Sequence, residues 1–213
     1  MTQKTFWQDP YLTELKTVVA DVQGDRVHLE STIFFAFSGG QESDAGTLGG
    51  YPVLAATKEG LDIVYTLPHE HGLKAGERIE LRIDWDRRYR LMRLHFAAEM
   101  ILQLVYKHSP GIERIGAHIS PEKARIDFAR DENIAMLFPL LEQEASSLIT
   151  ADKPIATGFT DAKAQRRYWE VEGFARMDCG GTHPKSTAEI GMLKLNRKRL
   201  GKGKERIEII LLD

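Results

Sequence analysis

Long apolar segments are missing from this sequence of 213 residues. No stretch approaches the roughly 18 consecutive apolar residues that a membrane-spanning helix needs. The N-terminal stretch MTQKTFWQDPYLTELK also lacks the apolar run of a signal peptide. The sequence therefore predicts a cytoplasmic protein with no membrane partner.

Cysteine and net charge are scarce as well. The one cysteine, Cys179, has no second cysteine for an internal disulfide, which fits a reducing compartment and leaves two roles open, metal or catalytic chemistry and inert burial. The formal net charge of −2 does not exclude nucleic acid as a partner, because binding depends on where basic residues cluster. The contents of 42% hydrophobic and 28% charged residues are those of an ordinary globular protein.

Short β-type runs fill the first part of the chain. From Leu15 to about Asp84, runs rich in β-branched and aromatic residues alternate with glycine and charged turns, for example TIFFAF, LDIVYTL and RIELRID. Such closely spaced runs are typical of antiparallel strands. We expect a small antiparallel β-barrel here.

A helical pattern follows. The segment RRYRLMRLHFAAEMILQLVYKH has apolar residues at helical spacing, and a second helical segment runs from about Asp131 to Ile149. Strands are expected at ARIDFA, YWEVEGFA and ERIEIILL. Together these patterns predict an α+β fold, with a β-barrel domain at residues 1–88 and an α+β domain with a long helix at residues 89–213.

Two short motifs contain metal-ligand residue types. His95 and Glu99 are four residues apart on the predicted long helix, so their side chains project from the same face. Cys179 and His183 flank the glycines of CGGTH, which permit a tight loop. Each pair alone is more often an exposed polar pair or a buried thiol, but together they supply the number and types of ligand that zinc takes.

The stretch MDCGGTHPKSTAEIG resembles the signature of the editing domain of alanyl-tRNA synthetases and of their freestanding relatives, the AlaX proteins. The resemblance extends over most of the chain, through DPYL, TIFFAFSGGQESDAGTLGG, RLMRLH, ARIDF and KGKERIEI. It implies a metal-dependent hydrolase that deacylates mischarged tRNA(Ala), with Ser-tRNA(Ala) as the first expected substrate and Gly-tRNA(Ala) as the second. It also implies a zinc ion held by His95, Glu99, Cys179 and His183. The sequence gives no indication of protein partners.

Glu99 departs from the family pattern, which has histidine at this position. Two histidines and one carboxylate still form a known catalytic zinc set. With Glu99 and a Cys179 thiolate both bound, however, the charge of a divalent ion is neutralised, so that bound water is less acidified. The sequence leaves open an active site of altered metal preference, a weaker enzyme or a lost metal site.

The glycine-rich segment 38–46, SGGQESDAG, resembles a family segment near the editing pocket. In the mechanism that we expect, Gln41 and Thr182 are candidate catalytic residues that supply hydrogen bonds to the aminoacyl group or the developing oxyanion. A plain hairpin turn is the alternative for residues 38–46.

Two basic clusters are candidates for tRNA contact. The first, Arg87, Arg88, Arg90 and Arg93, fits RNA contact and a structural role about equally. The second can follow a phosphate backbone and is assigned to tRNA binding; it comprises Lys194, Arg197, Lys198, Arg199, Lys202, Lys204 and Arg206.

Two other functions remain open. One is a non-catalytic tRNA-binding protein with a decayed metal site, and the other is a metal-dependent hydrolase of a small ester or amide. Metal content, turnover of seryl-tRNA and affinity for tRNA distinguish them.

Overall fold

The computed structural model describes residues 1–212. The chain divides into two compact units. One contains residues 1–38 and 42–89, and the other contains residues 39–41 and the chain from Arg90 onward. The short segment 39–41 therefore belongs with the second half of the sequence.

The first unit is built around an antiparallel sheet of seven strands in the order β6-β5-β9-β2-β3-β8-β7. A short parallel pair, β1 with β4, and a 3-10 turn at Thr5–Trp7 accompany it. The strands are β1 Gln3–Lys4, β2 Glu14–Gln23, β3 Arg26–Leu29, β4 Ser31–Thr32, β5 Gly46–Leu48, β6 Tyr51–Pro52, β7 Ala55–Glu59, β8 Asp62–Thr66 and β9 Arg78–Ile83.

Strand β2 connects the two halves of this sheet. Its residues 14–18 pair with β9, and residues 19–23 pair with β3. The register shifts between Val19 and Asp21, and such an irregularity bends a strand and increases its twist. In the described residues, β6 and β7 are the edge strands of this sheet, so the sheet is open. The closed barrel expected from the sequence stays a prediction.

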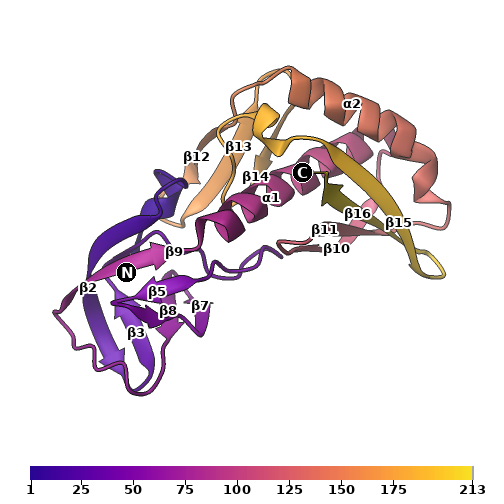
Figure 1. The fold of residues 1–213 in the computed structure, drawn as a ribbon. Coiled ribbons are helices and arrows are strands. Elements are labelled where there is room, and N and C mark those ends of the chain that lie inside the picture. Colours follow the sequence, from indigo (N-terminus) through magenta and orange to yellow (C-terminus); the bar gives the residue numbers. More distant parts are fainter. Residues whose placement is uncertain (213) are drawn as a thin grey trace. The chain divides into compact units, whose positions relative to one another are not determined.

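The second unit mixes helices and strands, which confirms the mixed class expected from the sequence. It has a four-stranded antiparallel sheet, β10-β11-β16-β15, and a three-stranded one, β12-β13-β14. Helix α1 runs between the strands β10 and β11 on one side and helix α2 on the other (Figure 1). The elements are α1 Trp85–His108, β10 Glu113–Ile119, β11 Ala124–Ala129, α2 Phe138–Thr150, β12 Ala156–Asp161, β13 Arg166–Val171, β14 Ala175–Asp178, β15 Leu193–Gly201 and β16 Lys204–Leu211, with 3-10 turns at Ile134–Leu137 and Thr187–Ile190.

Helix α1 is buried on nearly all sides. Leu91, Phe96, Met100 and Leu104 lie at different angles around the helix, and each is at most 1% exposed. A helix whose middle part is buried on nearly all sides is a core element, and its burial removes much apolar surface from water. Two polar side chains in its middle, His95 and Glu99, are consequently held inside the protein.

The segment 168–175 differs from the prediction of one strand. Strand β13 ends at Val171, and β14 begins at Ala175. Phe174 N donates to Val171 O, and Gly173 has φ 72°, a left-handed turn conformation that favours glycine. The sequence prediction also missed β10, β12 and β15, whose charged and small residues interrupt the alternating pattern.

In the described residues, 1–212, no helix is both long enough and apolar enough to cross a membrane.

Candidate metal and catalytic site

Two of the predicted metal ligands lie on the buried part of α1. His95 and Glu99 are 5% and 6% exposed, and they lie one turn apart on the same side of the helix. His95 Nε2 is 3.4 Å from Glu99 Oε1. The hydrophobic residues around the helix thus hold two polar groups in the interior, where unpaired charges are costly.

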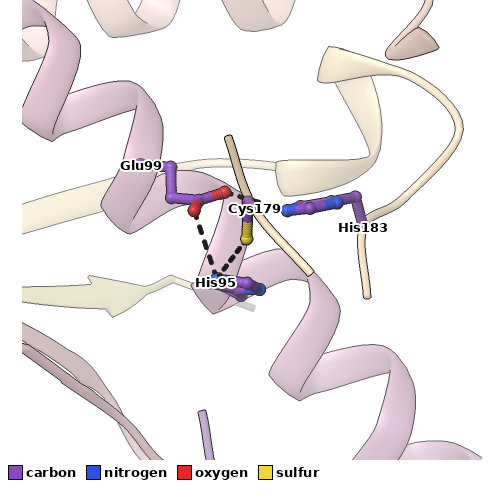
Figure 2. A group of neighbouring side chains, drawn as sticks. All are labelled: His95, Glu99, Cys179 and His183. Carbon is purple, nitrogen blue, oxygen red and sulfur yellow. Dashed lines mark hydrogen bonds and ion pairs between the residues drawn. The ribbon is translucent and has the colours of Figure 1, made fainter. Parts of the chain in front are cut away.

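The loop after β14 brings Cys179 and His183 to these groups (Figure 2). Cys179 Sγ is 3.6 Å from His95 Nε2, and His183 Nε2 is 2.8 Å from Glu99 Oε2. The loop can pass this close because residue 181 is glycine. A Cβ at Gly181 would lie 2.0 Å from His95 Cε1, a distance that no side chain tolerates.

The four side chains form a group that could hold one metal ion. Their ligand atoms, two nitrogens, one carboxylate oxygen and one sulfur, lie within 4.8 Å of one another. Bonds of roughly 2.0–2.3 Å to a tetrahedral zinc ion place neighbouring ligand atoms roughly 3.3–3.8 Å apart. Three of the separations, at 2.8, 3.4 and 3.6 Å, are near this range, and none of the others exceeds 4.8 Å, so the residues could hold such an ion after small shifts.

The electrostatics of the group also fit a divalent cation. Burial lowers the pKa of His95, but the charges of Glu99 and Cys179 outweigh burial and raise that pKa well above its ordinary value. The pKa of His183 is raised, again against burial, by Cys179 and Glu99.

The two acidic members show the opposite shift. Burial raises the pKa of Glu99, but His95 and His183 lower it well below its ordinary range. The pKa of Cys179 is lowered by the two histidines, although burial and Glu99 act against them. These shifts favour positive charge on the two histidines and negative charge on Glu99 and Cys179, and a divalent cation among neutral imidazoles would supply the same positive charge.

Gln41 and Thr182, the predicted catalytic residues, are hydrogen-bonded to each other, and Thr182 also contacts His95. Gln41 Nε2 donates to Thr182 Oγ1 at 2.9 Å, and Thr182 N donates to Gln41 Oε1 at 3.3 Å. The Thr182 carbonyl oxygen is 3.4 Å from His95 Nδ1. A carbonyl in this position accepts the Nδ1 proton and directs Nε2 toward a metal.

The segment 39–41 is attached to strand β10. Ile119 N donates to Gly40 O at 2.8 Å, and Gln41 forms an isolated bridge with Ile119. A Cβ at Gly40 would lie 2.8 Å from Ala117 O, and its φ is 90°, so glycine is required there. These residues are therefore more than the end of a hairpin turn, because they fix Gln41 beside the CGGTH loop.

A small pocket of about 20 Å³ adjoins the ligand group. His95 and Glu99 contribute to its wall, and the pocket is further lined by Gly39, Ala98, Leu102, Arg114, Ala117, Ile119 and Ile126. Sequence reasoning missed Arg114. No motif contains it, and its position depends on an irregular strand register.

The basic C-terminal cluster is divided between the two faces of the β15–β16 hairpin. Residues paired across an antiparallel ladder share a face, and Arg197 and Arg199 pair with Ile207 and Glu205, both of which are buried. Arg197 also forms an ion pair with Glu205, with Nε and Oε2 2.5 Å apart.

The opposite face of this hairpin has the other strand residues of the cluster. Lys198 pairs with Arg206, and Lys194 pairs with Ile210. Lys204 lies on the same face, while Lys202 lies in the turn. Arg206 is bound to Asp127, with Nε 2.6 Å from Oδ1, so the lysines are the members of this face without an ion-pair partner in residues 1–212.

The first basic cluster has structural roles. Arg88 is fully buried and pairs with Asp44, and Arg87 pairs with Glu42 at 2.8 Å. Arg90 and Arg93 donate to the carbonyl oxygens of Pro121 and Ile190. The helix pattern offered a signal for this outcome, because Arg88 precedes Leu91 by three residues and lies on its buried side.

Comparison with known proteins identifies the family. The alanyl-tRNA editing protein AlaX-M of Pyrococcus horikoshii is 32% identical over 215 residues, which cover 99% of this chain and 98% of that protein. That of Methanosarcina acetivorans is 32% identical over the whole of both chains. The alanine–tRNA ligase of Ignicoccus hospitalis is 30% identical over 98% of this chain, which covers 26% of the ligase. No protein-family model matches the chain.

These relatives fall into two classes, freestanding editing proteins and alanine–tRNA ligases. Identity over nearly the full length of the former decides between them. The chain belongs to the AlaX-M family of alanyl-tRNA editing proteins, as the CGGTH motif indicated.

Proposed function

We propose that this protein is a trans-editing hydrolase that deacylates mischarged tRNA(Ala). Ser-tRNA(Ala) is the first substrate and Gly-tRNA(Ala) the second. The observation that carries the proposal is the convergence of His95, Glu99, Cys179 and His183 within 4.8 Å, in a chain whose full-length relatives are named alanyl-tRNA editing proteins.

We infer that zinc is the ion for this group. Its two imidazoles, carboxylate and thiolate are all accepted zinc ligands, and the thiolate makes magnesium or calcium a poor match. Zinc bound there would supply positive charge that polarises the ester and its water. Glu99, which sits where the family motif has histidine, serves as a ligand in this proposal.

Gln41 and Thr182 have two roles in the proposal. Their mutual hydrogen bonds hold the CGGTH loop, and the Thr182 carbonyl orients the His95 ring. Gln41 Nε2 carries a second hydrogen, and the Thr182 hydroxyl keeps its own when it accepts from Gln41. These hydrogens are the candidate donors to the aminoacyl group or to the developing oxyanion.

The tRNA contact is proposed for the basic hairpin β15–β16. Of its two faces, the one with Lys194, Lys198 and Lys204 suits a phosphate backbone better, because Arg197 is paired with Glu205. Lys202, in the turn, adds a further positive charge next to this face. Arg197 and Arg206 are paired with carboxylates, so these two arginines contribute less to tRNA binding.

The test is deacylation of serine-charged tRNA(Ala) by the purified protein, with bound metal measured on the same sample. We expect turnover together with about one zinc ion per chain. Cys179→Ala should lose both, by more than about 100-fold in rate, since even changes behind metal ligands cost 10–100-fold. Cys179→Ser is the matched control, because it nearly keeps the shape of the side chain but replaces the sulfur ligand.

The outcomes separate the proposal from its alternatives. Binding of tRNA without metal or turnover would overturn it in favour of a tRNA-binding protein with a decayed site. Metal-dependent hydrolysis of small esters without affinity for tRNA would overturn it in favour of a small-molecule hydrolase. Turnover that persists in Cys179→Ala would remove the metal site from the mechanism.

A further inference from the structure

Arg114 lies in the wall of the small pocket next to His95 and Glu99. We propose that Arg114 binds the phosphodiester on the 5′ side of the terminal adenosine while the aminoacyl ester enters the pocket. This inference rests on the proposed function, because it assigns the part of the tRNA end that lies outside the pocket.

The register of strand β10 places Arg114 on the side of the sheet that lines the pocket. In strand β10, Gly116 pairs with Asp127 and His118 with Arg125, so these alternate residues share one face. Position 114 would lie on that face too if the strand were regular. The register shifts between Arg114 and Gly116, however, and Arg114 pairs with Phe128.

Phe128 is fully buried and belongs to the same core as α1. Ala117 and Ile119, which pair with Ile126 and Ala124, lie on this same side and line the pocket. The extra residue at Ile115 therefore moves Arg114 from the outer face to the pocket face. Bulges commonly redirect a side chain next to an active site.

The charge of Arg114 is available for a ligand. In the described residues, 1–212, no carboxylate lies within ion-pair distance of it, and its side chain is exposed. Its neighbours in the sheet differ, because Arg125 and Arg206 are both paired with Asp127. An arginine fork matches two oxygens of a phosphate group.

The size of the pocket determines which part of the ligand meets Arg114. A space of about 20 Å³ takes only a small group, such as the side chain of serine or glycine's hydrogen. The ribose and its phosphate must then remain at the mouth, where the exposed arginine lies. The exposed guanidinium at the mouth attracts the charge of the phosphate.

The experiment compares two minimal substrates, seryl-adenosine, which has no phosphodiester, and the seryl ester of cytidylyl-adenosine, which has one. Arg114→Gln should raise KM about tenfold for the dinucleotide ester and for seryl-tRNA(Ala), with kcat changed less than about twofold. Seryl-adenosine should be hydrolysed as by the unaltered protein. Arg114→Lys should recover part of the loss, since it keeps the charge but not the fork.

Arg125→Gln is the matched control, because it removes an arginine from the adjacent strand on the opposite face. It should leave KM unchanged for both minimal substrates. An equal loss on both substrates in Arg114→Gln, or no loss on either, would overturn phosphate recognition by Arg114.

A hydrolysis-resistant amide analogue of each minimal substrate separates this inference from the proposed function. If the unaltered protein hydrolyses neither these esters nor seryl-tRNA(Ala), the proposed function fails. Calorimetric binding of the two analogues still tests Arg114. Arg114→Gln should weaken binding of the dinucleotide analogue about tenfold and leave the nucleoside analogue unaffected; equal affinities would overturn the assignment.

Discussion

Helix α1 carries two buried charged groups that differ in how their polar atoms are satisfied. Arg88 and His95 are separated by two turns of the same helix, and both are at most 5% exposed. Arg88 donates to Asp44 Oδ1 at 2.8 Å and to Pro10 O at 2.9 Å, and also to Ile33 O and Asp44 Oδ2. The guanidinium of Arg88 and the carboxylate of Asp44 thus satisfy each other, with backbone carbonyls accepting further hydrogens, and the group needs no ligand.

The group around His95 is incomplete by comparison. Its ligand atoms face one another, and the buried His183 Nδ1 has no hydrogen-bond partner. Buried charge is tolerated in the first group because fixed donors and acceptors neutralise it. In the second, two acids and two bases are held together around a point where a cation fits. The comparison shows that burial of charge does not by itself indicate function, and that the convergence of four ligand atoms is what makes the second group a candidate metal site.

The largest effect is expected from the removal of Arg88, which tests whether the first group has a structural role. Arg88→Met leaves Asp44 buried without its counter-charge, so the free energy of unfolding should fall by about 3–5 kcal/mol in urea denaturation. Arg87→Met is the control from the adjacent position. Its ion pair with Glu42 is partly exposed, and its loss should cost less than about 1 kcal/mol. Equal costs for the two variants would contradict the structural role of Arg88.

The next effect concerns the metal group alone. Gly181→Ala places a Cβ 2.0 Å from His95 Cε1 and should displace the ring or the loop. We expect zinc affinity to fall by about 10–100-fold, measured by competition with a chelator. Gly180→Ala is the matched control, because a Cβ there meets nothing within 4 Å. A loss of affinity as large in Gly180→Ala would argue that loop flexibility, rather than the contact with His95, matters.

A smaller effect is expected where charge is exposed rather than buried. Lys198→Glu should raise KM for seryl-tRNA(Ala) about fivefold and weaken its salt dependence, because Lys198 lies on the lysine face of the hairpin. Arg199→Glu, the neighbouring residue on the face with Arg197 and Glu205, should change KM less than about twofold. The reverse order would place the tRNA on the other face.

The smallest effect comes from a third buried charge, Lys4. Its ammonium group donates to Leu61 O at 2.6 Å and lies 4.8 Å from the Trp7 ring, and burial, followed by Lys58, lowers its pKa to about 8. Between about pH 8 and 10.5 the unfolded chain therefore binds more protons than the folded chain, so Lys4 makes stability rise with pH.

Lys4→Met removes this dependence. The variant should gain about 1 kcal/mol relative to the unaltered protein at pH 7, and this gain should shrink as the pH approaches 10. Urea denaturation at several pH values measures both effects. A gain that is independent of pH would show that packing, and not the ammonium charge, is responsible.

The sequence indicated the parts of the fold that repeat regularly. Helix α1 and strand β11 follow from apolar residues at helical spacing and at alternate positions, which the sequence shows directly. Most residues of β12 and half of those of β14 are exposed, and these strands are stabilised by pairing partners that the local pattern does not contain. Whether the N-terminal strands close into a barrel is also a matter of long-range pairing.

The same division holds for the site. The sequence by itself determined the residue types and spacings of His95, Glu99 and the CGGTH loop, because helical geometry and glycine act over a few residues. Only the tertiary structure decided that these segments meet, that Gln41 lies beside Thr182, and that Arg114 faces the pocket. Contacts between residues 41 and 182, or the effect of one extra residue in a strand, depend on packing and register over the whole unit, and these are not encoded in any short stretch of sequence.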